Sequence, residues 1–392
     1  MDENNKKLYL EANLQIIFGI TLMAVLGVAS ITPAFPTIMR ELGISSLGIG
    51  LLITVFTFPG VVLSPVVGVF ADRYGRKKIL VPSLFVFGIA GGACALARDF
   101  NVLLLLRFFQ GIGAASLSAI NVTIIGDLYS GRERAAAMGY NASVLSFGTA
   151  AYPAIGGALT MIGWYYPFAL PLLAIPLGFI VIYYLKNPEP KMEQHLKDYF
   201  RNVLRSLNNR QVIGIFAASI VTFVILYGPL LTYFPLLLAE SFGAMPLIIG
   251  LSITISSLVT VVTSSQLGKI TKKYSERTLL KVTFLIYGSA MVLIPLVPKL
   301  ILFLIPVGLF GIAHGLNIPC FQTLLAGLAP MEYRGAFMSL NGMVLRLGQT
   351  LGPPLMGVIF SLWGVEATFY SGAVLAGLMF LFGVIMIRDV RK

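Results

Sequence analysis

The stretch GVFADRYGRKK, residues 68–78, lies between two apolar runs, FTFPGVVLSPVV before it and ILVPSLFVFGIAGGACAL after it. Five of its eleven residues are charged, whereas charged residues make up only 11% of the 392-residue chain. Soluble globular proteins carry about 25% charged residues, so this chain has too little polar surface to coat a water-soluble body. Apolar runs joined by short charged turns are instead typical of a protein that crosses a membrane several times.

Twelve apolar runs can be distinguished, and each is long enough to cross a bilayer as a helix. The chain is 57% hydrophobic, with a mean hydropathy of +0.88. The runs are continuous, whereas the strands of a membrane β-barrel alternate apolar and polar residues. We therefore predict an all-α polytopic membrane protein with spans at residues 13–38, 46–70, 79–97, 102–125, 139–161, 165–185, 212–238, 246–268, 279–297, 300–326, 336–361 and 365–387.

Lysine and arginine gather in alternate connections between the spans. The side that holds both termini carries 23 of the 28 basic residues and the other side carries three, while Arg107 and Arg346 lie within spans. Basic residues mark the cytoplasmic connections of membrane proteins. We therefore predict a protein of the cell (inner) membrane with both termini in the cytoplasm. The net charge of +12 reflects this topology, and no nucleic-acid partner is expected.

An offset of 200 residues aligns the two halves of the chain without a gap. The offset covers six spans, and an even number of spans returns the chain to the same side, so both halves have the same orientation. We predict two parallel six-helix repeats (6+6) around a central cavity. The predicted parts are an N-terminal bundle at 1–185, a cytoplasmic linker with an amphipathic helix at 186–211, and a C-terminal bundle at 212–392. Identical residues at this offset include Gly50 and Gly250, Thr54 and Thr254, Asn141 and Asn341, and Pro153 and Pro353.

Three motifs give the chain a resemblance to the major facilitator superfamily, and within it to the drug:proton antiporters. GVFADRYGRKK resembles the signature between helices 2 and 3 of that family, LLRFFQGIGAAS resembles its helix-4 motif, and GYNASVLSFGTAAYPAIGG resembles its helix-5 antiporter motif. Two positions depart from the pattern. Tyr152 stands where glycine usually precedes the proline, and Lys272 replaces the acidic residue in the second-half copy of the signature.

The resemblance implies a conformational latch at the cytoplasmic face. In the family the signature's aspartate, here Asp72, lies near the start of helix 11, and helix N-termini carry partial positive charge. Arg134 and Arg76 are further expected partners, and a solvated turn aspartate is the alternative. The residues expected to form the latch are Gly68, Asp72, Arg73, Gly75, Arg76, Lys77 and Arg134.

Small residues and prolines in spans 5 and 11 predict a seam between the two halves. Small side chains let helices approach closely, and proline kinks a helix. Tight packing without movement is the alternative to a seam along which the halves rock. The residues expected there are Gly139, Gly148, Pro153, Gly156, Gly157, Gly352, Pro353 and Gly357.

Ionisable groups inside the spans indicate a functional cavity, because a charge in the bilayer core costs about 2.5–3.5 kcal/mol and marks function. All 16 acidic residues lie in connections, tails or span ends. Two buried arginines without an acid predict a positive cavity and an anionic substrate, unless the arginines pair with carbonyl groups. The candidate coupling and substrate residues are Arg107, Gln110, Asn121, His314, Asn317, Arg346 and Gln349.

Separate roles are expected for three of these residues. The resemblance links Arg107 to proton transfer, and an interfacial anchor is the alternative. Arg346 and His314 have no charged or titratable counterpart in the first half, because the 200-residue offset places Ser146 and Ala114 at those positions. We expect Arg346 to hold a negative or carbonyl group of a substrate. We expect His314 to sense protons, although a lone buried histidine is more often a residue satisfied by a structural hydrogen bond.

The leading hypothesis is a monomeric, proton-coupled secondary active transporter that exports small amphipathic compounds by rocker-switch alternating access. Protons are the coupling ion and no other cofactor is expected, and the partners are the substrate and the bilayer. The alternative is a carrier or flippase for anionic solutes or lipids that uses Arg107 and Arg346. An enzyme is not expected, because the sequence has no nucleophile–base pair, metal cluster or nucleotide-binding loop.

Overall fold

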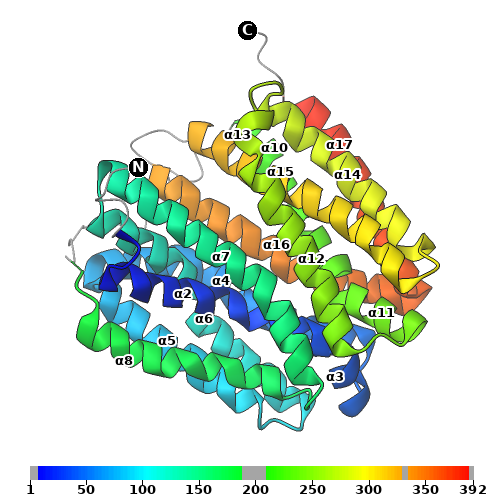
Figure 1. The fold of residues 1–392 in the computed structure, drawn as a ribbon, viewed down its shortest axis with the longest axis horizontal. Coiled ribbons are helices and arrows are strands. Elements are labelled where there is room, and N and C mark those ends of the chain that lie inside the picture. Colours follow the sequence, from blue (N-terminus) through cyan, green and yellow to red (C-terminus); the bar gives the residue numbers. More distant parts are fainter. Residues whose placement is uncertain (1–7, 188–208, 329–333, 388–392) are drawn as a thin grey trace.

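The computed structural model describes residues 8–187, 209–328 and 334–387. Figure 1 shows that the described chain is a set of long helices packed side by side. The described residues contain no strand. Twelve helical segments are long and apolar enough to cross a membrane, so the predicted all-α, twelve-span architecture is confirmed. The amphipathic helix predicted within 186–211 falls almost entirely outside the described residues.

The first six spans form one bundle of helices joined by short turns. Its elements are α2 (Ala12–Ala29) with η1 (Thr32–Ala34) and α3 (Phe35–Glu41), α4 (Ser46–Tyr74), α5 (Arg76–Cys94), α6 (Phe100–Leu128), α7 (Gly131–Thr160), and η2 (Tyr166–Leu173) with α8 (Ala174–Tyr184).

The last six spans form the second bundle, which follows the same order. Its elements are α10 (Arg210–Ile225) with the π-helical segment η3 (Leu226–Tyr233) and α11 (Phe234–Phe242), α12 (Pro246–Ser265) with the short α13 (Leu267–Ile270), α14 (Glu276–Leu296), η4 (Leu300–Phe303) with α15 (Leu304–Leu328), α16 (Arg334–Trp363) and α17 (Val365–Met386).

The molecule has two ends, and each collects alternate turns. We call the end where α2 begins and α17 ends the basic end. We call the other end, which carries the turns after α3, α5, α7 and α11, the opposite end. Figure 1 shows the bundles converging at α3 and α11, at the opposite end, and diverging towards the end that holds the N-terminus.

Local sequence sets where the helices begin and turn. Ser45 caps α4 by accepting a hydrogen bond from the Gly48 amide, and Ser275 caps α14 in the same way, because a side-chain oxygen can satisfy a free amide in the first helical turn. Gly43 and Gly243 have φ values of 61° and 59°. These two glycines are equivalent under the 200-residue offset and occupy a left-handed conformation that glycine adopts without steric cost.

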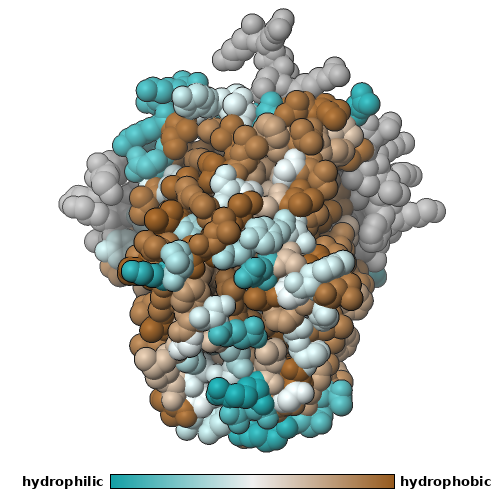
Figure 2. Space-filling view, turned by 90° about the vertical axis from the view of Figure 1, so that its right-hand side faces the viewer, coloured by the Kyte–Doolittle hydropathy of each residue, from teal (hydrophilic) through white to brown (hydrophobic). Residues whose placement is uncertain are grey.

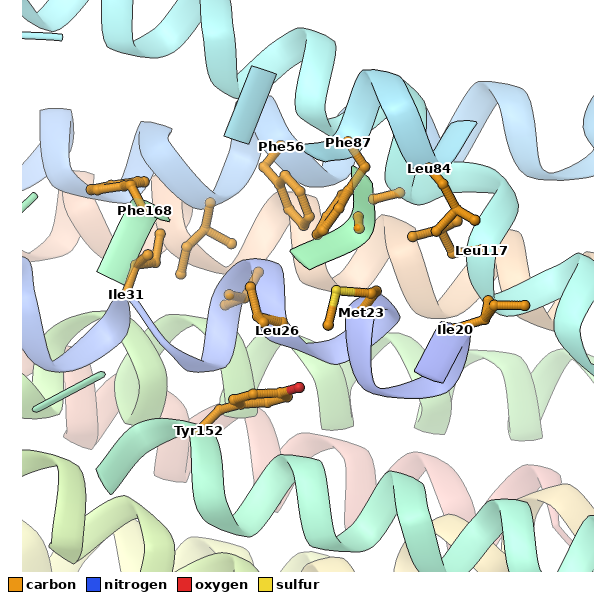
Figure 3. Packing of buried hydrophobic residues seen from close by; sticks show 14 of the residues in the cluster. Ile20, Met23, Leu26, Ile31, Phe56, Leu84, Phe87, Leu117, Tyr152 and Phe168 are labelled. Atoms are coloured by element: carbon orange, nitrogen blue, oxygen red, sulfur yellow. The ribbon is translucent and has the colours of Figure 1, made fainter. Parts of the chain in front are cut away.

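Each bundle has its own hydrophobic core, and the first explains the departure at Tyr152. Figure 3 shows the Tyr152 ring lying across α2, beside Met23 and Leu26. Tyr152 is only 9% exposed and belongs to the first core. The tyrosine thus fills space between α2 and α7 that a glycine would leave empty.

The surface of the protein is suited to a bilayer. Figure 2 shows hydrophobic residues over most of the face on the right-hand side of Figure 1, with hydrophilic residues gathered in patches. Exposed large hydrophobic side chains occur along most of the spans. Apolar surface of this extent is favourable in contact with lipid and marks an interaction surface in any soluble protein.

Gly156 provides a direct test of the packing inside the first bundle. A Cβ at Gly156 would lie 1.8 Å from the Ser30 carbonyl oxygen, whereas a Cβ at Gly308 would have nothing within 4 Å. Overpacking of this kind costs about 1–3 kcal/mol. We expect Gly156→Ala to lower the thermal unfolding temperature of the purified protein and Gly308→Ala to leave it unchanged or raise it. Equal unfolding temperatures for the two variants would contradict the packing of α2 on α7.

Candidate functional site

Two pairs of helices hold the bundles together. α4 of the first bundle packs on α16 of the second, and α12 of the second packs on α7 of the first. The 200-residue offset relates α4 to α12 and α7 to α16, so the two pairs are pseudo-symmetric. We call them the α4–α16 seam and the α7–α12 seam.

Glycine meets a proline carbonyl group at the same position in both seams. A Cβ at Gly250 would lie 2.1 Å from the Pro153 carbonyl oxygen, and a Cβ at Gly50 would lie 3.1 Å from that of Pro353. The absence of a side chain therefore lets the two backbones touch. Gly157 and Gly357 contact residues at the start of the facing helix in the same symmetric manner.

Threonine hydroxyl groups cross both seams one turn further along. Thr54 Oγ1 donates to the Thr350 carbonyl oxygen at 3.1 Å, and Thr254 Oγ1 donates to the Ala150 carbonyl oxygen at 2.7 Å. Pro354 has no N–H, so the Thr350 carbonyl lacks its usual donor within the helix and is available to the facing helix. The seams are thus closed by backbone-directed hydrogen bonds as well as by small residues.

Tyr233 reinforces the α4–α16 seam at the opposite end. Its side chain is fully buried, and its hydroxyl lies 3.1 Å from the Ser46 carbonyl oxygen and 2.9 Å from that of Pro353. Tyr233 ends the π-helical segment η3, so one phenol joins spans 2, 7 and 11. Sequence reasoning missed this residue, and its position after the Gly228–Pro229 pair in an apolar span is the signal that could have drawn attention to it.

The structure divides the predicted seam residues into three groups. Four of them lie on the seams, namely Pro153, Gly157, Pro353 and Gly357. Three others contact the first span of their own bundle, so their predicted place between the halves is corrected; these are Gly148, Gly156 and Gly352. Gly139 lies near the basic end of α7, and a Cβ there would have nothing within 4 Å.

Towards the basic end the α7–α12 seam opens into a cleft of about 460 Å³. Its lining contains no charged residue. The residues that line it are Ala142, Ser143, Ser146, Phe147, Ala150, Leu258, Val261, Ser264 and Ser265. We call this space the α7–α12 cleft.

Arg346 occupies the α4–α16 seam near the middle of the spans. Its Nη2 donates to the Ala114 carbonyl oxygen of the first bundle at 3.3 Å. A Cβ at Gly60 would come within 2.4 Å of Arg346 Cδ, so the arginine passes over a glycine to reach α6. Gln349 lies on the same helix and is half-buried.

Arg107 is fully buried in the first bundle, so its side chain does not extend to a membrane–water interface. Its Nε donates to the Leu52 carbonyl oxygen at 3.1 Å, and its Nη1 donates to the Gly27 carbonyl oxygen and to Gln110 Oε1, both at 2.8 Å. The guanidinium lies 4.1 Å from the centre of the Phe56 ring. Arg107 therefore joins α2, α4 and α6, which corrects its alternative interpretation as an interfacial anchor.

Both arginines found within spans thus donate to carbonyl groups of the chain. Carbonyl groups are acceptors that satisfy guanidinium donors without a partner acid. The expectation of a positive cavity is corrected for Arg107, whose side chain has no exposed surface. Arg107 Nη2 is buried without a hydrogen-bond partner among the described residues.

The two predicted asparagines hold helices together within each bundle. In the first bundle Asn121 donates to the Thr21 hydroxyl, which also contacts Asn141 Oδ1. In the second, Thr222 Oγ1 donates to Asn317 Oδ1 at 3.0 Å. Both networks join the first and fourth spans of a bundle and are buried. Buried amide groups need such partners, so these contacts fit a structural role.

Among the described residues, aromatic side chains surround His314. Its Nδ1 lies 2.7 Å from the Tyr287 hydroxyl, and its ring stacks on Phe310 with the ring centres 5.9 Å apart. Phe223 lies against the histidine at a centre-to-centre distance of 6.5 Å. The hydrogen bond satisfies the imidazole in its neutral form, which supports the structural alternative for this residue.

At the basic end, the buried Arg76 forms an ion pair with the half-buried Asp127. Arg76 Nε lies 2.8 Å from Asp127 Oδ2, and Arg76 Nη1 donates to the Ala71 carbonyl oxygen at 3.2 Å. Lys77 Nζ donates to the Ile182 carbonyl oxygen at 2.6 Å. The ion pair thus joins the α4–α5 turn to the end of α6, and Lys77 joins the same turn to the end of α8. Asp127 was not among the predicted site residues, although an acid that ends an apolar span at this face is a recognisable signal.

The structure gives fewer contacts for the other predicted latch residues. The side chain of Asp72 lies outside the described residues, as do those of the facing residues 334–339. Gly75 has a φ of 105° and makes the turn between α4 and α5. Arg134 and Arg73 are exposed, and a Cβ at Gly68 would have nothing within 4 Å. The latch role of Asp72 therefore stays a prediction.

Comparison with known proteins agrees with this architecture. The chain is 28% identical over 357 residues to Multidrug resistance protein 2 of Bacillus subtilis, with 88% of each chain covered. It is 26% identical over 387 residues to the quinolone resistance protein NorA of Staphylococcus aureus, with 96% of this chain and 95% of the relative covered.

A solved structure shares the fold over the whole length of the chain. A bacterial homologue of the human lysosomal transporter Spinster, in an inward-facing and occupied conformation, superposes with a TM-score of 0.82 and 17% identity, covering 100% of this chain and 98% of the other. The family model of the Major Facilitator Superfamily matches residues 17–243 and 230–392. With its twelve spans and two pseudo-symmetric seams, the chain belongs to the Major Facilitator Superfamily of membrane transporters.

Proposed function

We propose that this protein exports small amphipathic compounds across the cell membrane in exchange for protons, by alternating access. The observation that carries the proposal is that the α7–α12 seam is closed at the opposite end and open towards the basic end. The hydrogen bond between Thr254 and Ala150 is the last contact of the α7–α12 seam described above, and the α7–α12 cleft begins there. Two bundles that touch at one end and part at the other can rock about their contact and expose a central site to each side in turn.

The contacts across the seams suit such a movement. In the α7–α12 seam they are glycine–carbonyl contacts and a threonine hydrogen bond, and in the α4–α16 seam the hydrogen bonds of Tyr233 and Arg346 are added to such contacts. A hydrogen bond of this kind contributes about 0.5–1.5 kcal/mol net, so each seam can separate without a large cost. Pseudo-symmetry supplies an equivalent set of contacts for each bundle. These features support rocking of two rigid bundles over a local rearrangement.

The class of substrate follows from the relatives and from the placement of charge. Multidrug resistance protein 2 and the quinolone resistance protein are named for resistance to drugs. The α7–α12 cleft carries no charge, and Arg107 is bonded to carbonyl groups inside the first bundle. Amphipathic drug-like compounds therefore fit better than anionic solutes or lipids. The anionic alternative rests on Arg346 alone.

Proton coupling is proposed to act at the basic end. Asp127 pairs with Arg76 between α6 and the α4–α5 turn. Protonation of this carboxylate would remove one charge of the pair and so weaken the attraction between the two side chains. Protons arriving from the basic end would thus weaken the contact that ties the signature turn to α6. Among the described residues, gain of a proton would act more directly on this ion pair than on His314, which is surrounded by aromatic side chains.

Transport under a controlled pH gradient tests the proposed function. The variant Ser143→Cys with Val261→Cys places two thiols across the α7–α12 cleft, and the native Cys94 and Cys320 are buried. We expect proteoliposomes to accumulate a cationic amphipathic dye only with a proton gradient. Oxidative cross-linking of the pair should stop accumulation, and reduction should restore it. Dye movement that ignores both the gradient and the cross-link would refute proton-coupled alternating access.

Arg107 is predicted to be required for coupling because it joins three spans through carbonyl groups. Arg107→Ala should abolish gradient-driven dye transport, and Arg107→Lys should retain little, because lysine lacks the forked donors that reach two carbonyls at once. Arg40→Ala, which removes an exposed arginine of the same bundle, is the control and should transport normally. The measurement is the initial rate of dye uptake. Transport by Arg107→Ala at the wild-type rate would show that Arg107 has no part in coupling.

A further inference from the structure

Two buried hydrogen-bond donors in the first bundle have no acceptor among the described residues. One is Arg107 Nη2, the guanidinium nitrogen that makes none of the contacts given above for this side chain. The other is the amide nitrogen of Gln110, Nε2. Both side chains have no exposed surface. Buried polar groups in proteins nearly always have a partner, so two orphaned donors side by side indicate a missing acceptor.

The two donors are neighbours. Gln110 Oε1 accepts a hydrogen bond from Arg107 Nη1 at 2.8 Å. Arg107 Nη2 shares a carbon atom with Nη1, and Gln110 Nε2 shares a carbon atom with Oε1, so the two orphaned donors flank this one hydrogen bond. A Cβ at Gly91 would lie 2.6 Å from Gln110 Nε2 and 2.5 Å from the Pro171 Cβ. This close packing limits a partner of the amide nitrogen to a small one.

The charge of Arg107 is not balanced by an acid of the described residues. Its hydrogen bonds go to carbonyl and amide oxygens only. The nearby Cys94 supplies no charge, because its thiol donates to the Ala90 carbonyl oxygen at 3.2 Å and is therefore protonated. Figure 3 shows Phe56, the ring beside the guanidinium, among apolar side chains of the first core. A charge buried without a counter-charge is costly.

The second bundle shows that the fold does not require this charge. The 200-residue offset places Val307 where Arg107 stands and Phe310 where Gln110 stands. Both are 1% exposed and belong to the second hydrophobic core. A bundle of the same design therefore closes with apolar residues at this position. The arginine and the amide of the first bundle are an addition to the fold, and their free donors point to a ligand.

The missing acceptor can be a water molecule or an anion, and the chemistry of the site favours an anion. A buried water makes about three hydrogen bonds and must donate as well as accept. The neighbouring acceptors, namely Gln110 Oε1 and the carbonyl oxygens of Gly27 and Leu52, already accept from Arg107. An anion needs donors alone, and it also balances the guanidinium charge.

We propose that Arg107 Nη2 and Gln110 Nε2 bind a single small monovalent anion, of the size of chloride, inside the first bundle. The anion completes the set of contacts by which Arg107 joins α2, α4 and α6. The packing at Gly91 excludes larger oxyanions such as sulfate. The ion is a resident of the first bundle, distinct from the exported compound, so the site does not rest on the proposed function.

Thermal unfolding of the purified protein tests the site. The sodium salts of chloride, bromide, sulfate and gluconate are compared at equal ionic strength. We expect chloride and bromide to raise the unfolding temperature by about 3–5 °C over gluconate, with saturation, because a ligand that binds only the folded state stabilises it. Sulfate should have no such effect. Unfolding temperatures that are the same in chloride and gluconate would overturn the proposal and assign the two donors to water.

A variant that carries its own anion is the sharpest comparison. Gln110→Glu places a carboxylate beside Arg107, so it should unfold at the same temperature in all four salts, close to that of the wild type in chloride. Arg40→Ala removes an exposed arginine of the same bundle and should keep the wild-type response to chloride. A chloride response that persists in Gln110→Glu would place the ion elsewhere and overturn the proposal.

Binding of radioactive chloride to the purified protein gives an independent measurement. We expect one chloride per chain, displaced by bromide and not by sulfate. Binding should be absent in Gln110→Glu and weaker by about tenfold in Gln110→Leu, which loses one of the two donors. Full binding by both variants would overturn the proposal. Neither measurement uses transport, so the site can be confirmed or refuted whether or not the protein exports amphipathic compounds.

Discussion

The contact between a glycine on one bundle and a proline carbonyl group on the other is the constraint on which the rest of the structure depends. Gly250 and Gly50 bring the backbones of facing helices together at equivalent depths. Only at such a short separation can Thr254 and Thr54 reach carbonyl groups of the other bundle. The seams are therefore held by weak, exchangeable contacts whose position is fixed by the absence of side chains.

Charge inside the membrane is managed by the same backbone. Arg107 donates to two carbonyl groups within the first bundle and so holds three spans in one rigid unit. Arg346 donates to a carbonyl group across the α4–α16 seam. An arginine keeps its charge under all relevant conditions, so Arg107 serves as a fixed connection within the first bundle, and the contact of Arg346 across the seam does not depend on pH. The titratable pair lies elsewhere, at the basic end, where Asp127 meets Arg76. The separation of rigid connections from a titratable pair suits a protein whose bundles move as units.

Hydropathy and the 200-residue offset were sufficient to predict the fold, because the length of an apolar run and the number of spans between repeats constrain it directly. Small residues and prolines predicted two of the four seam helices, α7 and α16, although glycines alone do not reveal which neighbour they face, and Gly156 contacts its own bundle. Asp127 and Tyr233 could not be assigned from the sequence because their partners are distant in the chain and depend on how spans 4 and 7 are rotated. The pairing of arginines with carbonyl groups was likewise open, since backbone acceptors leave no mark in a sequence.

The distance between spin labels across the two ends tests the central claim most directly. One labelled pair, Phe147→Cys with Leu258→Cys, spans the α7–α12 cleft, and a second, Ile162→Cys with Met245→Cys, uses exposed residues at the opposite end. Alternating access predicts opposite changes when the pH is lowered or an amphipathic dye is added, with one distance shortening as the other lengthens. Distances that stay constant, or that lengthen together, would contradict the rocking of two rigid bundles about their seams.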